Sequence, residues 1–344
     1  MTLADVLDVT VVSSAHWQGD PRLNRHVAYL QTAGIKAEFV TTKSPSGRVA
    51  SAVNAVVAVM RLRSPVVILP NPELFLFGTL AARLTGKRPV IDIHEDYSKV
   101  AAARQWIPDP VRPLVGWLAG VFTWLGRILA WRIVVAAPEL ASPGDYLVLN
   151  VPDPGSFTPS PSAGSSRRLV YVGDVTVARG VLEMVDTLGE LDPEFELVVI
   201  GAVDDETRRL VTSKASKLGV TDRLNLAGRL PHSEAWALAR EAVAGLSPLR
   251  PVPAYREAVA TKLWEYMAAG LPPLVSDLPG QSAVISEIDP ALVCATAKEF
   301  AEQTIRLSRD TGFREEVVAT GLEMVNRKWS EHRPDLTLQE AVTP

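Results

Sequence analysis

The chain has 344 residues, of which 47% are apolar and 22% are charged, and its formal net charge is −4. This length favours two domains over one core. A groove for a nucleic-acid backbone usually shows as a basic excess, so the charge argues against nucleic-acid binding.

Short aliphatic and β-branched runs recur along the chain and alternate with helical patterns. In the first half they cover residues 8–12, 37–41, 66–69, 89–93, 132–136 and 146–149. In the second half they cover residues 168–172, 196–200, 223–226, 243–246 and 273–276. Continuous runs of this length are typical of parallel strands buried on both faces. The pattern predicts an α/β protein of two Rossmann-like, doubly wound domains.

Residues 151–166 separate the two series and are dominated by proline, glycine and serine. We therefore predict an N-terminal domain over 1–150, a linker over 151–166 and a C-terminal domain over 167–328. A final helix within 329–344 is expected to pack back on the N-terminal domain. Open α/β sheets bind ligands at the carboxyl ends of their strands, so we expect the two domains to face each other across a ligand-binding cleft.

Two segments at predicted strand ends carry polar residues in the first half. Asp20 precedes Pro21 and is expected to cap a helix, while Arg22 is a candidate for an acceptor or phosphate contact. The strand at 89–93 releases His94, Glu95, Asp96 and Tyr97, a cluster for which a buried strand has no structural use. A capped turn with a satisfied histidine is the alternative. A metal site is disfavoured because no partner histidine is evident.

Residues 111–131 contain Trp117, Trp124 and Trp131, spaced by seven residues on one stripe of a helix. The longest charge-free stretch has 14 residues, too short for a membrane span of about 20. Two interpretations remain open: packing against the N-terminal sheet, or an in-plane helix at a membrane surface.

Residues 255–277 predict a loop, a helix from about Thr261 to Ala269, a glycine stop at Gly270 and a buried strand. Lys262 and Glu265 then share one helix face near its N-terminus. An ammonium beside free helix N–H groups suits a diphosphate, and a carboxylate one turn later suits a ribose diol. A surface ion pair is the alternative.

Residues 168–181 predict a strand, a loop opening at Gly173 and a helix starting near Gly180. Gly173 would let the backbone approach a ligand, and Arg179 would lie beside an anion at the helix start. Gly201 ends the next strand. Arg229 lies in the loop of residues 227–232, and His232 in that loop is suited to cap a helix.

The run Lys262–Pro272 resembles the nucleotide-sugar signature of retaining GT-B glycosyltransferases of group 1, which are family 4-like. In that family a pair of glutamates separated by seven residues precedes a Met-Ala-x-Gly-x-Pro helix end; here the pair is Glu257 and Glu265. The segment around Gly173 is similar to the family's phosphate-binding loop. Two departures are evident: Glu257-Ala258-Val259-Ala260 replaces a glycine-rich loop, and Asp174 stands where the family often has its first cation.

The resemblance implies roles for residues along the chain. Glu265 would hold the donor ribose, Lys262 and Arg179 the diphosphate, and His94 and Glu257 the donor sugar. The donor-binding set implied is Gly173, Arg179, Gly201, Arg229, Lys262, Leu263 and Glu265. Asp20, Arg22, Glu95 and Asp96 are the candidates on the acceptor side.

The activity implied is transfer of a sugar from a nucleoside-diphosphate sugar to a glycan, lipid-linked or small-molecule acceptor, without a metal cofactor. The single cysteine, Cys294, cannot form an internal disulfide, which favours the cytoplasm. No signal peptide is evident, and the tryptophan helix suggests the inner face of the membrane. Alternatives are a nucleotide-sugar epimerase of similar fold and a non-catalytic nucleotide-sugar-binding scaffold. A dinucleotide oxidoreductase is disfavoured because no Gly-x-Gly-x-x-Gly follows the first strand.

Overall fold

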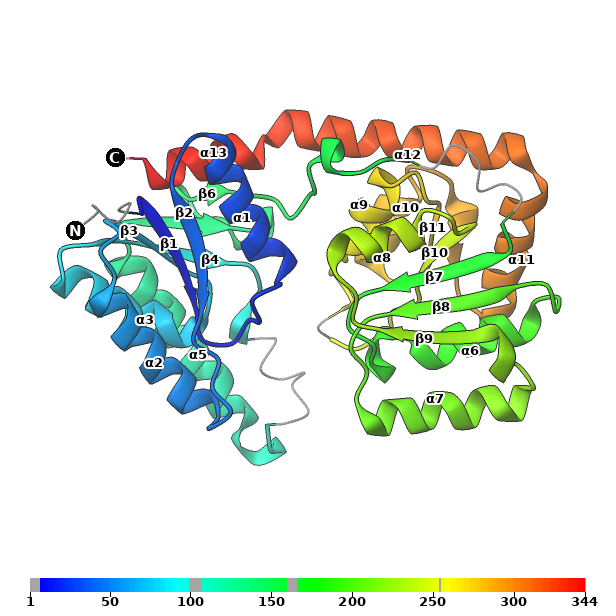
Figure 1. The fold of residues 1–344 in the computed structure, drawn as a ribbon, viewed down its shortest axis with the longest axis horizontal. Coiled ribbons are helices and arrows are strands. Elements are labelled where there is room, and N and C mark those ends of the chain that lie inside the picture. The colour runs from blue at the N-terminus through cyan, green and yellow to red at the C-terminus, as the bar shows by residue number, and fades with distance from the viewer. Residues whose placement is uncertain (1–6, 99–106, 160–165, 254, 344) are drawn as a thin grey trace, which may run out of the picture. The chain divides into compact units, whose positions relative to one another are not determined.

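The computed structural model describes residues 7–98, 107–159, 166–253 and 255–343 (Figure 1). Part of the predicted linker, residues 160–165, lies outside the described residues. The chain divides into two compact units. The first comprises residues 1–150 with 331–344, and the second comprises residues 151–330.

The first unit is built on a six-stranded sheet in the order β2-β1-β3-β4-β5-β6, and every pairing in it is parallel. The strands are β1 (Val9–Ser13), β2 (Ala37–Thr41), β3 (Val66–Leu69), β4 (Arg88–Ile93), β5 (Arg132–Val135) and β6 (Tyr146–Leu147). β1, β3 and the inner residues of β4 are buried on both faces, as continuous apolar runs require.

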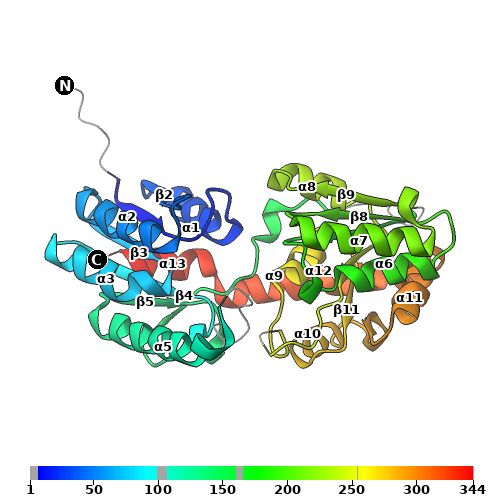
Figure 2. The same cartoon turned by 90° about the horizontal axis from the view of Figure 1, so that it is seen from below.

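Helices cover both faces of this sheet (Figures 1 and 2). α1 (Pro21–Thr32) and α13 (Pro334–Val342) pack together on one face. α2 (Arg48–Arg61), α3 (Pro72–Leu84) and α5 (Arg112–Leu129) form a layer on the other, with α3 in contact with both neighbours.

The second unit has its own six-stranded parallel sheet, in the order β12-β11-β10-β7-β8-β9. The strands are β7 (Arg168–Val172), β8 (Glu196–Ile200), β9 (Leu224–Gly228), β10 (Ala244–Ser247), β11 (Pro273–Ser276) and β12 (Val293–Cys294). The predicted fold class, two parallel Rossmann-like α/β sheets, is therefore confirmed. β12 was not predicted, because two residues make no recognisable run; Cys294 in it is buried, as expected.

Side chains of β7 and β8 alternate between two apolar clusters on opposite faces of the sheet. α6 (Val181–Glu190), α7 (Asp205–Leu218) and α11 (Ala297–Arg309) contribute to one cluster, and α8 (His232–Ala239) contributes to the other. α9 (Thr261–Ala268) contributes Leu263 to the first cluster and Tyr266 to the second. α10 (Pro279–Ile285) follows β11.

The C-terminal segment continues the second unit and then returns to the first. α12 (Thr311–His332) ends at Arg333, whose left-handed backbone (φ 35°, ψ 64°) turns the chain into α13. α13 contacts α1, β5 and β6, and its Leu338, Ala341 and Val342 are buried. The last helix therefore completes the first unit.

The tryptophan helix α5 packs with its glycines and not with its tryptophans. Gly116 and Gly126 are its buried residues, whereas the exposed fractions of Trp117 and Trp124 are 63% and 61%. The core-packing interpretation is therefore wrong for these two tryptophans, because glycines let α5 lie directly against α3. Trp131 is half-buried, with the guanidinium of Arg132 4.1 Å from its ring centre. In the part of the chain that is described, no helix has the length and apolarity to cross a membrane.

Substitution of Gly126 tests this packing. A Cβ there would lie 2.6 Å from the Phe75 Cβ and 3.1 Å from its backbone oxygen, so α5 would have to move away from α3. We expect Gly126→Ala to lower the free energy of unfolding by about 1–3 kcal/mol in urea titrations.

Gly120→Ala is the matched control on the same helix. Its Cβ would approach nothing nearer than the Ser98 Cβ, at 4.0 Å. We expect it to leave stability unchanged or to raise it, since alanine favours a helix by about 1 kcal/mol over glycine. Equal effects of the two substitutions would contradict the packing argument.

Candidate functional site

In the second unit, two glycines line the carboxyl ends of adjacent strands. Gly173 follows β7 and Gly201 follows β8. A Cβ on Gly201 would lie 1.7 Å from the Gly173 carbonyl oxygen, so no larger residue fits. The Gly173 N–H donates to the Ile200 carbonyl and the Gly201 N–H to the Gly228 carbonyl. At the ends of β7, β8 and β9 the adjacent residues are therefore glycines, and no side chain of theirs covers the backbone between them.

Lys262 lies over this backbone from the first turn of α9. A Cβ on Gly173 would be 3.0 Å from the Lys262 Nζ, and the Nζ is 3.6 Å from the centre of the Tyr171 ring. The side chain is buried, and its ammonium has no hydrogen-bond partner among the described residues. Burial, and then the charge of Arg179, holds the pKa of Lys262 well below its usual range, against Glu265 and Asp174. A buried ammonium in this state is costly, and an anion bound beside it would relieve that cost.

Glu265 lies one turn further along α9 and is also buried, at 8% exposure. The alternative of a surface ion pair between Lys262 and Glu265 is therefore wrong. Leu263 faces the core, where it is fully buried, and so positions the helix without being available to a ligand.

The end of α9 is fixed as predicted. Gly270 adopts φ 68°, its N–H donates to the Met267 carbonyl, and the Leu271 N–H donates to the Tyr266 carbonyl. This is a Schellman motif, in which a left-handed glycine satisfies the last carbonyls of the helix.

Arg179 stands in the 3-10 turn Val177–Arg179, which precedes α6. The Thr176 hydroxyl caps this turn by accepting from the Arg179 N–H. The guanidinium carbon lies 5.7 Å from the centre of the Tyr255 ring. Burial opposes the charge, but Tyr171, Tyr255 and Asp174 together raise the pKa of Arg179 above its usual range. Arg179 is therefore a permanent cation close to Lys262.

Asp174 and Arg229 pair with each other at the margin of this group. The Arg229 Nη2 is 3.8 Å from the Asp174 Oδ1, and both side chains are exposed, at 41% and 66%. His232 is the first residue of α8, and its ring lies 6.0 Å from that of Phe157 and 6.1 Å from that of Trp236.

Glu257 does not join the buried group. Its side chain is 76% exposed, and its carboxylate lies 3.7 Å from the Arg256 guanidinium. Its backbone is held against α10, where a Cβ on Gly280 would lie 2.4 Å from the Glu257 oxygen. The spacing of the motif is present, but the loop turns the Glu257 side chain to solvent, and its contact with the donor sugar stays a prediction.

In the first unit, His94 follows β4 and lies within a polar cluster. The Tyr97 hydroxyl is 3.2 Å from the His94 Nδ1, and the centre of the His94 ring is 5.6 Å from that of the His16 ring. Burial lowers the pKa of His94, against the opposing charge of Asp92. His94 is therefore neutral at physiological pH and able to exchange hydrogen bonds with a ligand.

Two members of this cluster were missed in the sequence. His16 lies 2.9 Å from the Ser13 hydroxyl, and Asn71 accepts from that hydroxyl at 2.7 Å. His16 follows the end of β1, and Asn71 follows the end of β3. Applying the strand-end rule to every strand, and not to β4 alone, would have found them.

The acceptor-side candidates divide between this cluster and the core. Asp20 caps α1, as predicted, by accepting from the Leu23 N–H at 3.0 Å, and its Oδ2 is 3.9 Å from the His16 Nε2. Glu95 and Asp96 are half-buried beside His94, and Asp96 accepts from the Ser98 hydroxyl. No group of three or more His, Cys, Asp or Glu placed to hold a metal ion was found among the described residues.

Arg22 belongs to the core, which corrects its assignment as a ligand contact. Its Nε and Nη2 donate to both carboxylate oxygens of the fully buried Asp92, at 3.1 and 2.7 Å, and its Nη1 donates to the Val148 carbonyl. Burial alone would raise the pKa of Asp92, but Arg22 and His26 hold it well below its usual range. The pair therefore fastens α1 to β4.

His26 gives this pair a pH dependence. Its Nδ1 is 3.7 Å from the Asp92 Oδ2, and burial lowers its pKa from 6.5 to about 3. In the unfolded chain His26 becomes protonated below about pH 6.5, whereas in the folded protein it stays neutral down to about pH 3. Its contribution to stability is therefore complete above pH 6.5 and is lost as the pH falls through this window.

We expect the free energy of unfolding to decrease with pH below about 6.5, at up to about 1.4 kcal/mol per pH unit from this residue. His26→Gln should flatten the dependence when urea unfolding is followed across the same range. Parallel curves for the variant and the wild type would mean that His26 is protonated in the folded chain.

We compared the sequence and the structure with those of known proteins. Residues 156–324 match the family described as Glycosyl transferases group 1. Glycosyltransferase 1 domain-containing protein 1 of Xenopus tropicalis is 26% identical over 148 residues, which cover 43% of this chain and 41% of that relative. The chain thus spans less than half the length of this curated relative.

Solved structures match almost the whole chain. Sucrose-phosphate synthase from Thermosynechococcus elongatus aligns with a TM-score of 0.72 at 16% identity, over 97% of this chain and 98% of that one. Anabaena HepE in complex with UDP and glucose aligns with a TM-score of 0.71 at 10% identity, over the same shares. The chain therefore has the GT-B fold, and the match to the group 1 glycosyltransferase family falls on the second unit.

Proposed function

We propose that this chain, whose second unit carries a group 1 glycosyltransferase domain, transfers a glycosyl group from a nucleoside-diphosphate sugar to an acceptor with retention of configuration. The observation that carries the proposal is the buried Lys262 ammonium without a hydrogen-bond partner among the described residues. It lies over Gly173, at strand ends where the backbone is bare. Such an arrangement suits a ligand that brings its own negative charge.

A diphosphate meets this requirement. Its oxygens would accept from Lys262 and from Arg179, whose raised pKa keeps it charged. As the bond to the sugar breaks, negative charge grows on the departing diphosphate, and these two cations would stabilise it. Glu265, buried one turn along α9, would accept hydrogen bonds from the ribose diol.

Uridine diphosphate sugars are the first donors to test. HepE, one of the solved GT-B structures, is in complex with UDP-glucose, and its TM-score with this chain is 0.69 at 12% identity. We propose His94 of the first unit as the residue that contacts the donor sugar. With Glu257 turned to solvent, we assign no carboxylate nucleophile and propose a front-face reaction in which the leaving phosphate helps to deprotonate the acceptor.

A calorimetric titration with UDP tests the donor site. We expect saturable binding that weakens by about 1–3 kcal/mol, or roughly 5- to 150-fold, in Lys262→Met and in Glu265→Gln. Lys298→Met is the matched control, because Lys298 is 76% exposed on α11 of the same unit. Its affinity should equal that of the wild type.

The same titration reports on the charge of Lys262. Because the pKa of Lys262 is depressed in the free protein, a bound diphosphate should raise it, so binding should take up protons as the pH increases. Buffers of different ionisation enthalpy measure this uptake, which should vanish in Lys262→Met. Wild-type affinity in both site variants, or uptake that persists without Lys262, would remove these residues from the donor site.

His94→Ala separates sugar transfer from nucleotide binding. We expect UDP affinity to stay within about twofold of the wild type, while transfer from the UDP-sugar falls by about 10²-fold or more. An equal loss of both would assign His94 to folding or to the nucleotide.

A nucleotide-sugar-binding protein without turnover is the second candidate. It is favoured by Asp174, an exposed carboxylate at the position where the resemblance calls for a cation. UDP-sugar binding with neither hydrolysis nor transfer in the wild type would support it.

A further inference from the structure

Three helices of the first unit carry most of the large apolar side chains that are exposed in the described residues. These side chains are Val49, Val53, Val57 and Met60 on α2, Phe77, Leu80 and Leu84 on α3, and Leu114, Trp117, Leu118, Trp124 and Ile128 on α5. Because α3 contacts both α2 and α5, the three helices form one layer, which we call the outer helical face.

Each helix presents these side chains at helical spacing. On α5 the stripe runs through Leu114, Trp117, Trp124 and Ile128, while Gly126 packs against Phe75 of α3. On α2 the outward stripe is complementary to the buried Ala55 and Val59. The sheet side of the layer is thus already filled, and the outward residues contribute nothing to the core. Scattered exposed apolar residues are ordinary, but a continuous patch of this kind marks an interaction surface.

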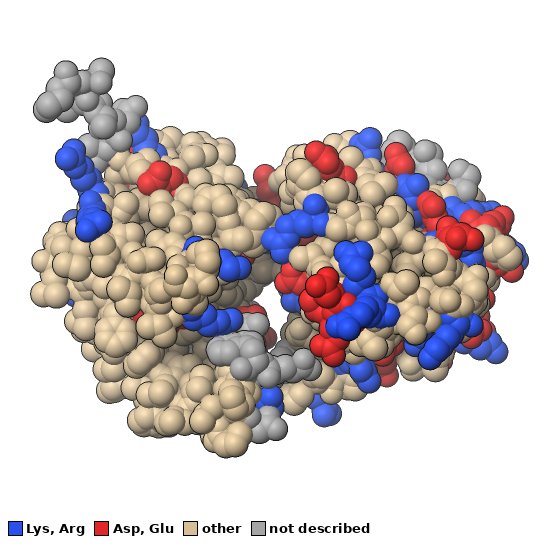
Figure 3. All heavy atoms as spheres, turned by 60° about the horizontal axis from the view of Figure 1, so that its bottom comes forward, with Lys and Arg blue, Asp and Glu red and all other residues tan. Residues whose placement is uncertain are grey.

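The charges of the outer helical face are almost all positive. The charged residues within its three helices are Arg48, Arg61, Arg83, Arg112, Arg127 and Glu73. Glu73, in the first turn of α3, accepts from the Ser14 hydroxyl, and Arg127 is paired with Asp145. Figure 3 shows this side of the first unit mostly in tan, with blue and a little red at its margins, whereas the second unit mixes blue and red throughout.

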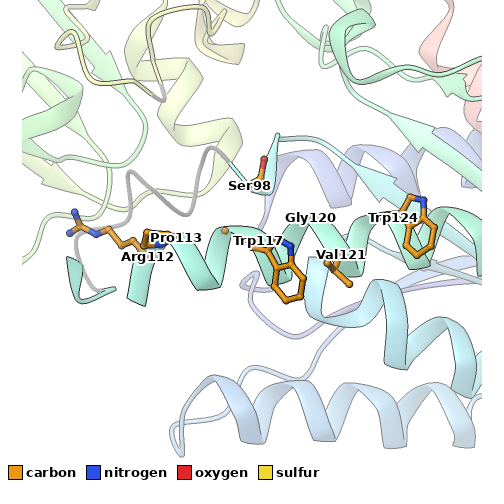
Figure 4. Close-up of a pocket in the computed structure, with 8 residues that line it drawn as sticks. Ser98, Arg112, Pro113, Trp117, Gly120, Val121 and Trp124 are labelled. Atoms are coloured by element: carbon orange, nitrogen blue, oxygen red, sulfur yellow. The ribbon is translucent and has the colours of Figure 1, made fainter. Parts of the chain in front are cut away.

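A groove of about 670 Å³ runs along α5, and its lining also includes Ser98, which follows β4 (Figure 4). Trp117, Val121 and Trp124 line its length, and Arg112 lies at one end. An apolar channel that ends in a guanidinium matches a fatty acyl chain that ends in a phosphate headgroup.

We propose that the outer helical face docks on an anionic phospholipid bilayer. The helices lie in the plane of the membrane, with Trp117 and Trp124 at the headgroup level and the arginines toward the lipid phosphates. Symmetric pairing of two copies through this face would bring its basic residues against one another, which disfavours a dimer. The surface belongs to the first unit and is independent of the donor site, which lies on the second.

Vesicle flotation tests the docking. The wild type should float with vesicles of phosphatidylcholine and phosphatidylglycerol, and much less with phosphatidylcholine alone. Trp117→Ser/Trp124→Ser should reduce partitioning by about tenfold or more, because two exposed indoles are lost. Arg48→Ala/Arg61→Ala, which removes the exposed arginines at the two ends of α2, should reduce it by at least about fivefold.

The matched control is Leu210→Ser/Leu218→Ser, which removes exposed apolar side chains of 46% and 45% exposure from α7 of the second unit. It should float like the wild type, and every variant should keep wild-type UDP affinity and melting temperature. A wild type that does not float, or a tryptophan variant that floats equally well, would overturn the proposal. So would a wild-type dimer in light scattering that the tryptophan substitutions convert to a monomer.

Discussion

The geometry of the proposed donor site depends on one ammonium group, that of Lys262, which is buried without a hydrogen-bond partner among the described residues. Removing an ion from water is expensive, and the surrounding chain has to hold it in place against that cost. α9 does so through Leu263, through Tyr266 and through the Schellman end at Gly270. The Tyr266 hydroxyl also accepts from the Val172 N–H, which ties the helix to the end of β7. The helix that carries the cation is thus fixed to the strand end over which the cation lies.

The first unit also contains buried charges, but these charges are paired with each other. Arg22 and Asp92 satisfy each other through two hydrogen bonds, and their mutual attraction holds Asp92 ionised. Such a pair stiffens a core and has no capacity left for a ligand. The contrast with Lys262 distinguishes a structural charge from one that is available for binding, a distinction that residue type alone does not give.

Much of the fold could be predicted because buried parallel strands are continuous apolar runs: the predicted bounds of β2, β3, β7, β8 and β11 coincide with the structure. The end of α9 before Gly270 could also be predicted, because it depends only on residues that are adjacent in the sequence. The partner of Arg22 could not be predicted, since Asp92 lies 70 residues away within an apolar strand. The spacing of Glu257 carried no information on which way its loop turns. The period of the tryptophans placed them on one stripe, but only the glycines of α5 decide which side of the helix faces α3.

The return of α13 to the first unit has a consequence for biosynthesis. Residues 331–344 belong to the same compact unit as residues 1–150, with the whole second unit between them in the chain. During translation the second unit can close on itself while the first still lacks α13, so the surface of α1, β5 and β6 that receives this helix stays uncovered until residues 334–342 have been synthesised. The order in which the ribosome delivers the chain thus lets the second unit be completed before the first.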